Sequence, residues 1–219
     1  MMKNLFYVIL LALLTTNAFS QNENIRFENR KGKGYFNTTQ ISLLMGRLPV
    51  NEQNYSYSYY QYDEEYRKIK TLPSVSMTNG YMFNEHWAAG VGIGFEMFDQ
   101  NMFPLFADIR YTLRDNEIAP FFAIKSGYSI GDLKKKHYDV LYFYYQPYYA
   151  TDVYFRNYGG FILHPEVGTK IPLSEKADLL VTIAYRYQVK KTSVTKENTK
   201  WEHIEDLYKL SFGVAIMFR

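Results

Sequence analysis

The chain has 219 residues, of which 47% are hydrophobic, 18% aromatic and 21% charged, and its formal net charge is +3. The aromatic content excludes a disordered chain, the absence of cysteine excludes a disulfide scaffold, and the small, scattered charge gives no reason to expect a nucleic-acid partner. The mean hydropathy of −0.32 argues against a helical membrane protein. It is compatible with a transmembrane β-barrel, because the strands of such a barrel alternate apolar and polar residues.

The first twenty residues have the three parts of a secretory signal peptide. Lys3 gives the positive start, residues 5–14 form an apolar run, and Ala18 and Ser20 are the small residues before a cleavage site. The apolar run is about half as long as the roughly 20 residues that a spanning helix needs. We therefore expect residues 1–20 to be removed, residues 21–34 to form a polar periplasmic lead, and residues 35–219 to form the folded domain.

Eight later segments alternate between apolar and polar residues with a period of two, as half-buried strands do. They are residues 35–46, 74–83, 87–98, 104–113, 118–130, 159–171, 179–189 and 207–218. Their length of about ten to twelve residues matches the roughly 9–11 residues that a tilted strand needs to cross a bilayer.

The connections between these segments are long and short in turn. Residues 47–72, 131–158 and 190–206 are long polar connections, and the shorter residues 99–103 take the remaining position on the same side. The turns between them are residues 84–86, 114–117 and 172–178. Long extracellular loops and short periplasmic turns are typical of up-and-down outer-membrane barrels. We expect both ends of the domain to be periplasmic, because an even number of strands begins and ends on the same side.

Aromatic residues stand near the ends of the apolar stripes, as they do in the interfacial girdles of membrane barrels. They are Tyr35, Phe83, Trp87, Tyr111, Phe122, Tyr128, Phe161, Tyr187, Tyr208 and Phe218. A soluble lipocalin-like barrel, the alternative, would bury its apolar face and would not need this distribution. The predicted fold is therefore all-β, an eight-stranded antiparallel up-and-down transmembrane β-barrel.

In the last segment, alternating apolar residues lead to an aromatic one: Tyr208, Leu210, Phe212, Val214, Ile216 and Phe218. This pattern resembles the C-terminal signature of outer-membrane β-barrels, although Arg219 follows the aromatic residue. Residues 35–219 resemble small eight-stranded proteins of the OmpA/OmpX type, or the related outer-membrane β-barrel domain family. The resemblance implies the outer membrane of a diderm bacterium, contact with its lipid and lipopolysaccharide, and the barrel-assembly machinery as a partner during insertion.

The interior of an eight-stranded barrel is just wide enough for side chains to fill, so inward charges should be paired. The expected inward charges are Glu96, Asp108, Arg110, Lys125, Glu166, Lys170, Arg186 and Lys209. All of these except Lys170 and Lys209 are expected to form one ion network, in which Arg110 is held between Asp108 and Glu96. Gly90, Gly92 and Gly94 are expected to leave room for long Arg and Lys side chains from neighbouring strands.

Catalysis has weaker support than binding. His164 and Glu166 lie on one face, with Ser129 or Ser211 as a candidate nucleophile, but a paired lumen histidine needs no special function. The histidines show no metal-ligand spacing, and no cofactor is expected.

The first and third long connections are rich in tyrosine, a residue that binding surfaces favour. The candidate binding surface is Tyr57, Tyr59, Tyr60, Tyr144, Tyr145 and Tyr148. These stretches could equally extend the strands above the bilayer, and protruding strand edges are themselves a docking mode. The sequence thus favours a non-enzymatic surface scaffold or adhesion protein with a protein or glycan ligand. The alternatives are a porin-like conduit for small solutes and a hydrolase acting on lipid A or peptides.

Overall fold

The computed structural model describes residues 32–49, 67–97, 101–114, 118–131, 136–140, 151–196 and 199–219. The predicted signal peptide, most of the N-terminal lead and the six tyrosines of the candidate binding surface lie outside these residues. Within them, no helix is long and apolar enough to cross a membrane.

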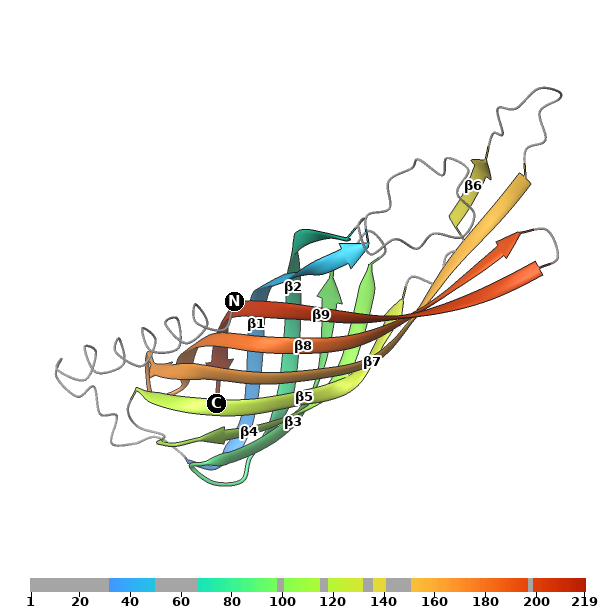
Figure 1. The fold of residues 1–219 in the computed structure, drawn as a ribbon. Helices are drawn as coiled ribbons and strands as arrows, with labels where there is room; N and C mark the ends of the chain where they lie inside the picture. Colours follow the sequence, from blue (N-terminus) through green and yellow to red (C-terminus); the bar gives the residue numbers. More distant parts are fainter. Residues whose placement is uncertain are drawn as a thin grey trace.

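The described residues form nine strands in one antiparallel sheet that closes into a barrel (Figure 1). They are β1 (Gly34–Pro49), β2 (Arg67–Met82), β3 (Trp87–Glu96), β4 (Met102–Thr112), β5 (Ala119–Gly131), β6 (Lys136–Val140), β7 (Thr151–Pro172), β8 (Ala177–Lys196) and β9 (Thr199–Phe218). The pairing of β1 with β9 closes the ring. The short β6 pairs with β7 beyond the end of β5 and continues it along the same edge. The barrel wall therefore has eight strands, as predicted.

The two faces of each strand differ in the way the sequence predicts. In β4, buried and exposed residues alternate from Met102 to Arg110. Leu105 and Ile109 point outward and are about half exposed, whereas Asp108 and Arg110 point inward and are buried. The same arrangement holds around the barrel, with apolar side chains outside and polar ones inside. A soluble barrel has the opposite arrangement, so this outer surface is suited to lipid.

Strand β1 begins and strand β9 ends on the same side of the barrel as the short turns. Asn37 of β1 lies opposite Phe218 of β9, and Gly34 lies opposite Met82, where β2 turns into β3. In that turn, Asn84 Oδ1 accepts the backbone N–H groups of His86 and Trp87 at 2.9 and 2.7 Å. The even strand number thus places both ends together, and the assignment of this side to the periplasm stays a prediction.

Four strands, β2, β7, β8 and β9, run much further than the sequence predicts. Figure 1 shows β7, β8 and β9 projecting beyond the rest of the barrel, and β8 pairs with β9 as far as Lys196 and Thr199. The prediction of a loop over residues 190–206 is therefore wrong. This stretch contains β-branched residues that favour strands, among them Thr192 and Ile204. The stretch is polar because it is exposed to water, and the sequence analysis interpreted this polarity as a loop.

The prediction that Gly90, Gly92 and Gly94 make room for Arg and Lys side chains is wrong, because the atoms nearest to them belong to the backbone and to Phe106, Pro104 and Ser76. A Cβ atom on Gly92 would lie 2.5 Å from the ring of Phe106. Two other inward phenylalanines lie on glycines in the same way. The three ring–glycine pairs are Phe36 on Gly80, Phe106 on Gly92 and Phe121 on Gly168, and the members of each pair are opposite each other in the register.

We expect Gly92→Ala to lower the free energy of unfolding by about 1–3 kcal/mol, the usual cost of overpacking. Urea unfolding in detergent micelles measures this loss. Phe106→Leu in the same chain should recover part of it, because it removes the ring atoms that the new Cβ meets. Purely additive losses would show that the ring is not the obstacle.

Candidate functional site

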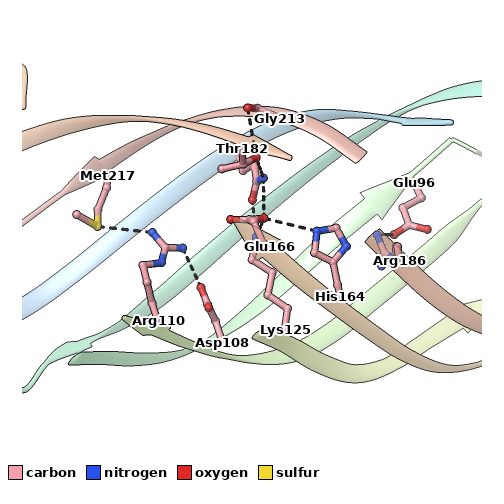
Figure 2. A network of polar contacts seen from close by, with 11 residues as sticks. Glu96, Asp108, Arg110, Lys125, His164, Glu166, Thr182, Arg186, Gly213 and Met217 are labelled. Carbon is pink, nitrogen blue, oxygen red and sulfur yellow. Dashed lines mark hydrogen bonds and ion pairs between the residues drawn. The ribbon is translucent and has the colours of Figure 1, made fainter. Parts of the chain in front are cut away.

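All six residues of the predicted ion network are buried in the lumen. Figure 2 shows that they form separate groups along the barrel axis, and not one network around Arg110. The ion pairs are Arg110 with Asp108, Lys125 with Glu166, and Arg186 with Glu96.

Arg110 lies in an apolar layer at the turn end of the barrel. Its Nη2 donates to Asp108 Oδ2 at 3.0 Å, and its guanidinium lies 5.1 Å from the ring centroid of Phe121 and 5.9 Å from that of Phe36. Cations at such distances are attracted to the ring faces. The buried apolar residues of this layer are Phe36, Met82, Ala88, Phe121, Ala123, Leu180, Ala215 and Met217. They close this end of the lumen.

The predicted contact between Arg110 and Glu96 is wrong. In the register of β3 and β4, Arg110 lies opposite Ala88, whereas Glu96 lies opposite Met102. Eight residues separate Ala88 from Glu96, which is about 27 Å along a strand. Glu96 Oε1 instead pairs with Arg186 Nη1 of β8 at 2.5 Å.

The middle of the lumen holds a group that the sequence identified only in part. Glu166 Oε2 accepts hydrogen bonds from Lys125 Nζ at 2.9 Å and from Gln40 Nε2 at 3.2 Å. Gln40 Oε1 accepts a second bond from Lys125 at 2.5 Å, and Gln40 Nε2 lies 3.0 Å from Thr182 Oγ1. The sequence analysis did not identify Gln40 as a member of this group. Finding its role needs the closure of the barrel, which brings β1 close to β5 and β7.

His164 belongs to this middle group, and its surroundings do not resemble a catalytic site. Its Nε2 lies 3.5 Å from Glu166 Oε2, and both side chains are buried. Ser129 Oγ, a candidate nucleophile, has no hydrogen-bond partner among the described residues. Among all the residues that the structure describes, no group of three His, Asp or Glu side chains is placed to hold a metal ion.

Above the middle group, Lys209 Nζ donates to Gln188 Oε1 at 2.6 Å, and Gln188 Nε2 lies 3.0 Å from Met102 Sδ. A small cavity of about 20 Å³ borders the middle group and is lined by Gln40, Lys125 and Arg186, among others. That volume is on the scale of one water molecule. The described side chains therefore fill the barrel as the sequence predicts, and the cavity is too small for a sugar or an amino acid.

Arg219, which departs from the C-terminal signature, turns into the barrel. Its Nε and Nη2 donate to Asp178 Oδ2 at 2.9 and 2.8 Å, and Asp178 is fully buried. Its backbone N–H donates to the carbonyl oxygen of Lys176 at 3.0 Å. Arg219 thus ties the end of β9 to the start of β8.

We expect Arg219→Gln to lower the free energy of unfolding by about 1.5–3 kcal/mol, the range for hydrogen bonds to charged groups. Lys176→Gln is the matched control, because the Lys176 side chain is exposed and its part in this contact is its backbone carbonyl. Equal stability of the two variants in urea would show that the bond to Asp178 contributes nothing.

Charged residues also pair on the part of the sheet that projects beyond the barrel. Glu202 accepts from Lys191 at 2.8 Å and from Lys200 at 2.9 Å, and the bonds from Lys191 and Lys200 lower the pKa of Glu202 to about 2. The bond to Glu202 raises the pKa of Lys200. The ring of Tyr158 lies 5.0 Å from the Arg156 guanidinium and 5.9 Å from Lys200 Nζ.

A closed wall of eight antiparallel strands, an apolar exterior and a filled polar interior define a small transmembrane β-barrel. No protein-family model and no curated protein matches the chain. Among solved structures, it is similar to the crystal structure of Neisserial surface protein A, with a TM-score of 0.50 and 11% identity over 86% of this chain and 99% of that one. The outer membrane protein OprG from Pseudomonas aeruginosa gives a TM-score of 0.49 and 11% identity over 87% and 98% of the two chains. At such identity the likeness shows the fold alone, and that fold is the predicted one.

Proposed function

We infer that the protein is a non-enzymatic barrel of the outer membrane that presents a binding surface outside the cell. The apolar exterior supports the membrane location, and the filled lumen argues against transport. The observation that carries the proposal is the sheet of β7, β8 and β9, which stands beyond the rest of the barrel (Figure 1).

One edge of this sheet is suited to docking. The pairing of β1 with β9 stops at Gly46 and Lys209, whereas β9 begins at Thr199. Among the described residues, the β9 edge between Thr199 and Tyr208 has no partner strand on the side away from β8. Such an edge can add a strand of a protein partner through main-chain hydrogen bonds. The tyrosines of the candidate binding surface are a second candidate for binding the partner.

A binding screen with two matched variants tests this proposal. The full chain in lipid nanodiscs is probed with extracellular proteins and surface glycans. In one variant, residues 192–203 are replaced by Asn-Gly, a turn that suits a two-residue hairpin. In the other, the six tyrosines of the candidate binding surface are changed to Ser.

Loss of a ligand in the first variant alone would assign binding to the sheet edge, and loss in the second alone would assign it to the tyrosines. Retention of every ligand by both variants would contradict the proposal. The conduit alternative predicts steady conductance in planar bilayers, and we expect none. In intact cells, an impermeant amine reagent should label the hairpin at Lys200, which is half exposed. If labelling needs permeabilised cells, the hairpin lies on the periplasmic side and the proposed orientation is wrong.

A further inference from the structure

We propose that the lumen cavity holds one small inorganic anion, of about the size of chloride. The cavity is lined by Lys125, Arg186, Ser42, Ser74 and Ser76, among others. Of the ten described residues that line it, none is Asp or Glu. The lining itself therefore carries no carboxylate, although Lys125 and Arg186 each pair with one, Glu166 and Glu96. This proposal is independent of the surface function above.

Arg186 and Lys125 each have N–H groups that their hydrogen-bond partners do not use. Arg186 pairs with Glu96 through Nη1, and its Nε has no hydrogen-bond partner among the described residues although the side chain is buried. Lys125 donates to Gln40 and Glu166, whereas an ammonium group has three N–H donors. Buried donors without acceptors are unfavourable, and an anion in the cavity would supply one.

The register at this level of the lumen also bears on the proposal. Arg186 and Lys209 lie opposite each other on β8 and β9, and both are buried. Like charges in opposite positions of a sheet are destabilising. An anion beside Arg186 would offset this repulsion.

The size of the cavity selects among anions. About 20 Å³ accommodates a particle on the scale of a water molecule. A halide ion is only somewhat larger than water, whereas phosphate and sulfate carry four oxygens around a central atom and do not fit. The cavity therefore predicts a monatomic, monovalent ligand.

Bromide is the probe, because it replaces chloride and scatters anomalously. Crystals of the full chain grown in bromide should show an anomalous peak in the lumen beside Arg186. In solution, the Tm should rise and saturate with chloride or bromide, relative to gluconate at the same ionic strength, since a ligand of the native state stabilises by mass action.

Three variants make the test specific. Glu96→Gln combined with Arg186→Gln keeps the lumen charge balanced and should abolish both the peak and the halide effect. Ser42→Ala combined with Ser74→Ala removes two donors without touching an ion pair, and should weaken the effect if the first variant fails to fold. Lys191→Gln removes an exposed cation of the hairpin and should change neither signal. The absence of a lumen peak, or an equal halide effect in all four proteins, would overturn the proposal.

Discussion

Arg186→Gln is expected to lower the free energy of unfolding by about 3–5 kcal/mol, because it leaves the buried Glu96 carboxylate without its partner. Glu96→Gln should cost a similar amount for the converse reason. The double variant should recover much of either loss, since two neutral amides can replace the ion pair. Urea unfolding of the four proteins, at one fixed chloride concentration, gives the coupling energy directly.

The control for this cycle uses the other arginine of the predicted network. Arg110 pairs with Asp108 and lies in the apolar layer at the turn end, far along the strand from Glu96. Combining Glu96→Gln with Arg110→Gln should therefore give additive losses. Coupling between Glu96 and Arg110, with additivity between Glu96 and Arg186, would mean that the register of β3 and β4 is different from the one described.

A charge on the outer face should act through lipid and not through lost partners. Ile109 stands between Asp108 and Arg110 but points outward, and is 55% exposed. Ile109→Arg should cost about 2–4 kcal/mol, the penalty for a cation near the bilayer midplane. The native Arg110, at the next position, carries the same guanidinium group but points inward. It is accommodated because a carboxylate and two aromatic rings surround it.

The contrast between lipid and detergent identifies the cause of this loss. The Ile109→Arg variant should be destabilised in lipid bilayers, and less so in small detergent micelles, which adapt around a charge more easily. Ile109→Leu is the size control and should be nearly neutral in both. An Ile109→Arg variant as stable as the wild type in bilayers would contradict the outward placement of this position.

The direction in which each side chain points could be predicted from the sequence because a strand has a strict period of two. The inward placement of Asp108, Lys125 and Glu166 follows without knowledge of any neighbouring strand. This kind of inference needs only local order, so it extends to most of the wall.

The pairing of the inward charges could not be predicted in the same way. The choice of Arg186 over Arg110 as the partner of Glu96 depends on the register of β3 with β4 and on which strands face each other across the lumen. Both are properties of the closed barrel. The lengths of β8 and β9 were missed for another reason: above the lipid, a strand no longer needs an apolar face, so the alternation that marks it fades while its hydrogen bonds continue.

The uneven height of the wall gives the molecule a tall side and a low side. Lys196 lies nine residues beyond Tyr187, where the aromatic side chains of β8 and β9 meet, and nine residues of strand reach roughly 30 Å. This reach equals the thickness of the hydrocarbon core of a bilayer. On the opposite side, β3 ends at Glu96, within the barrel. A protein that moves in the plane of the membrane would thus meet the projecting sheet when it approaches from the side of β7, β8 and β9.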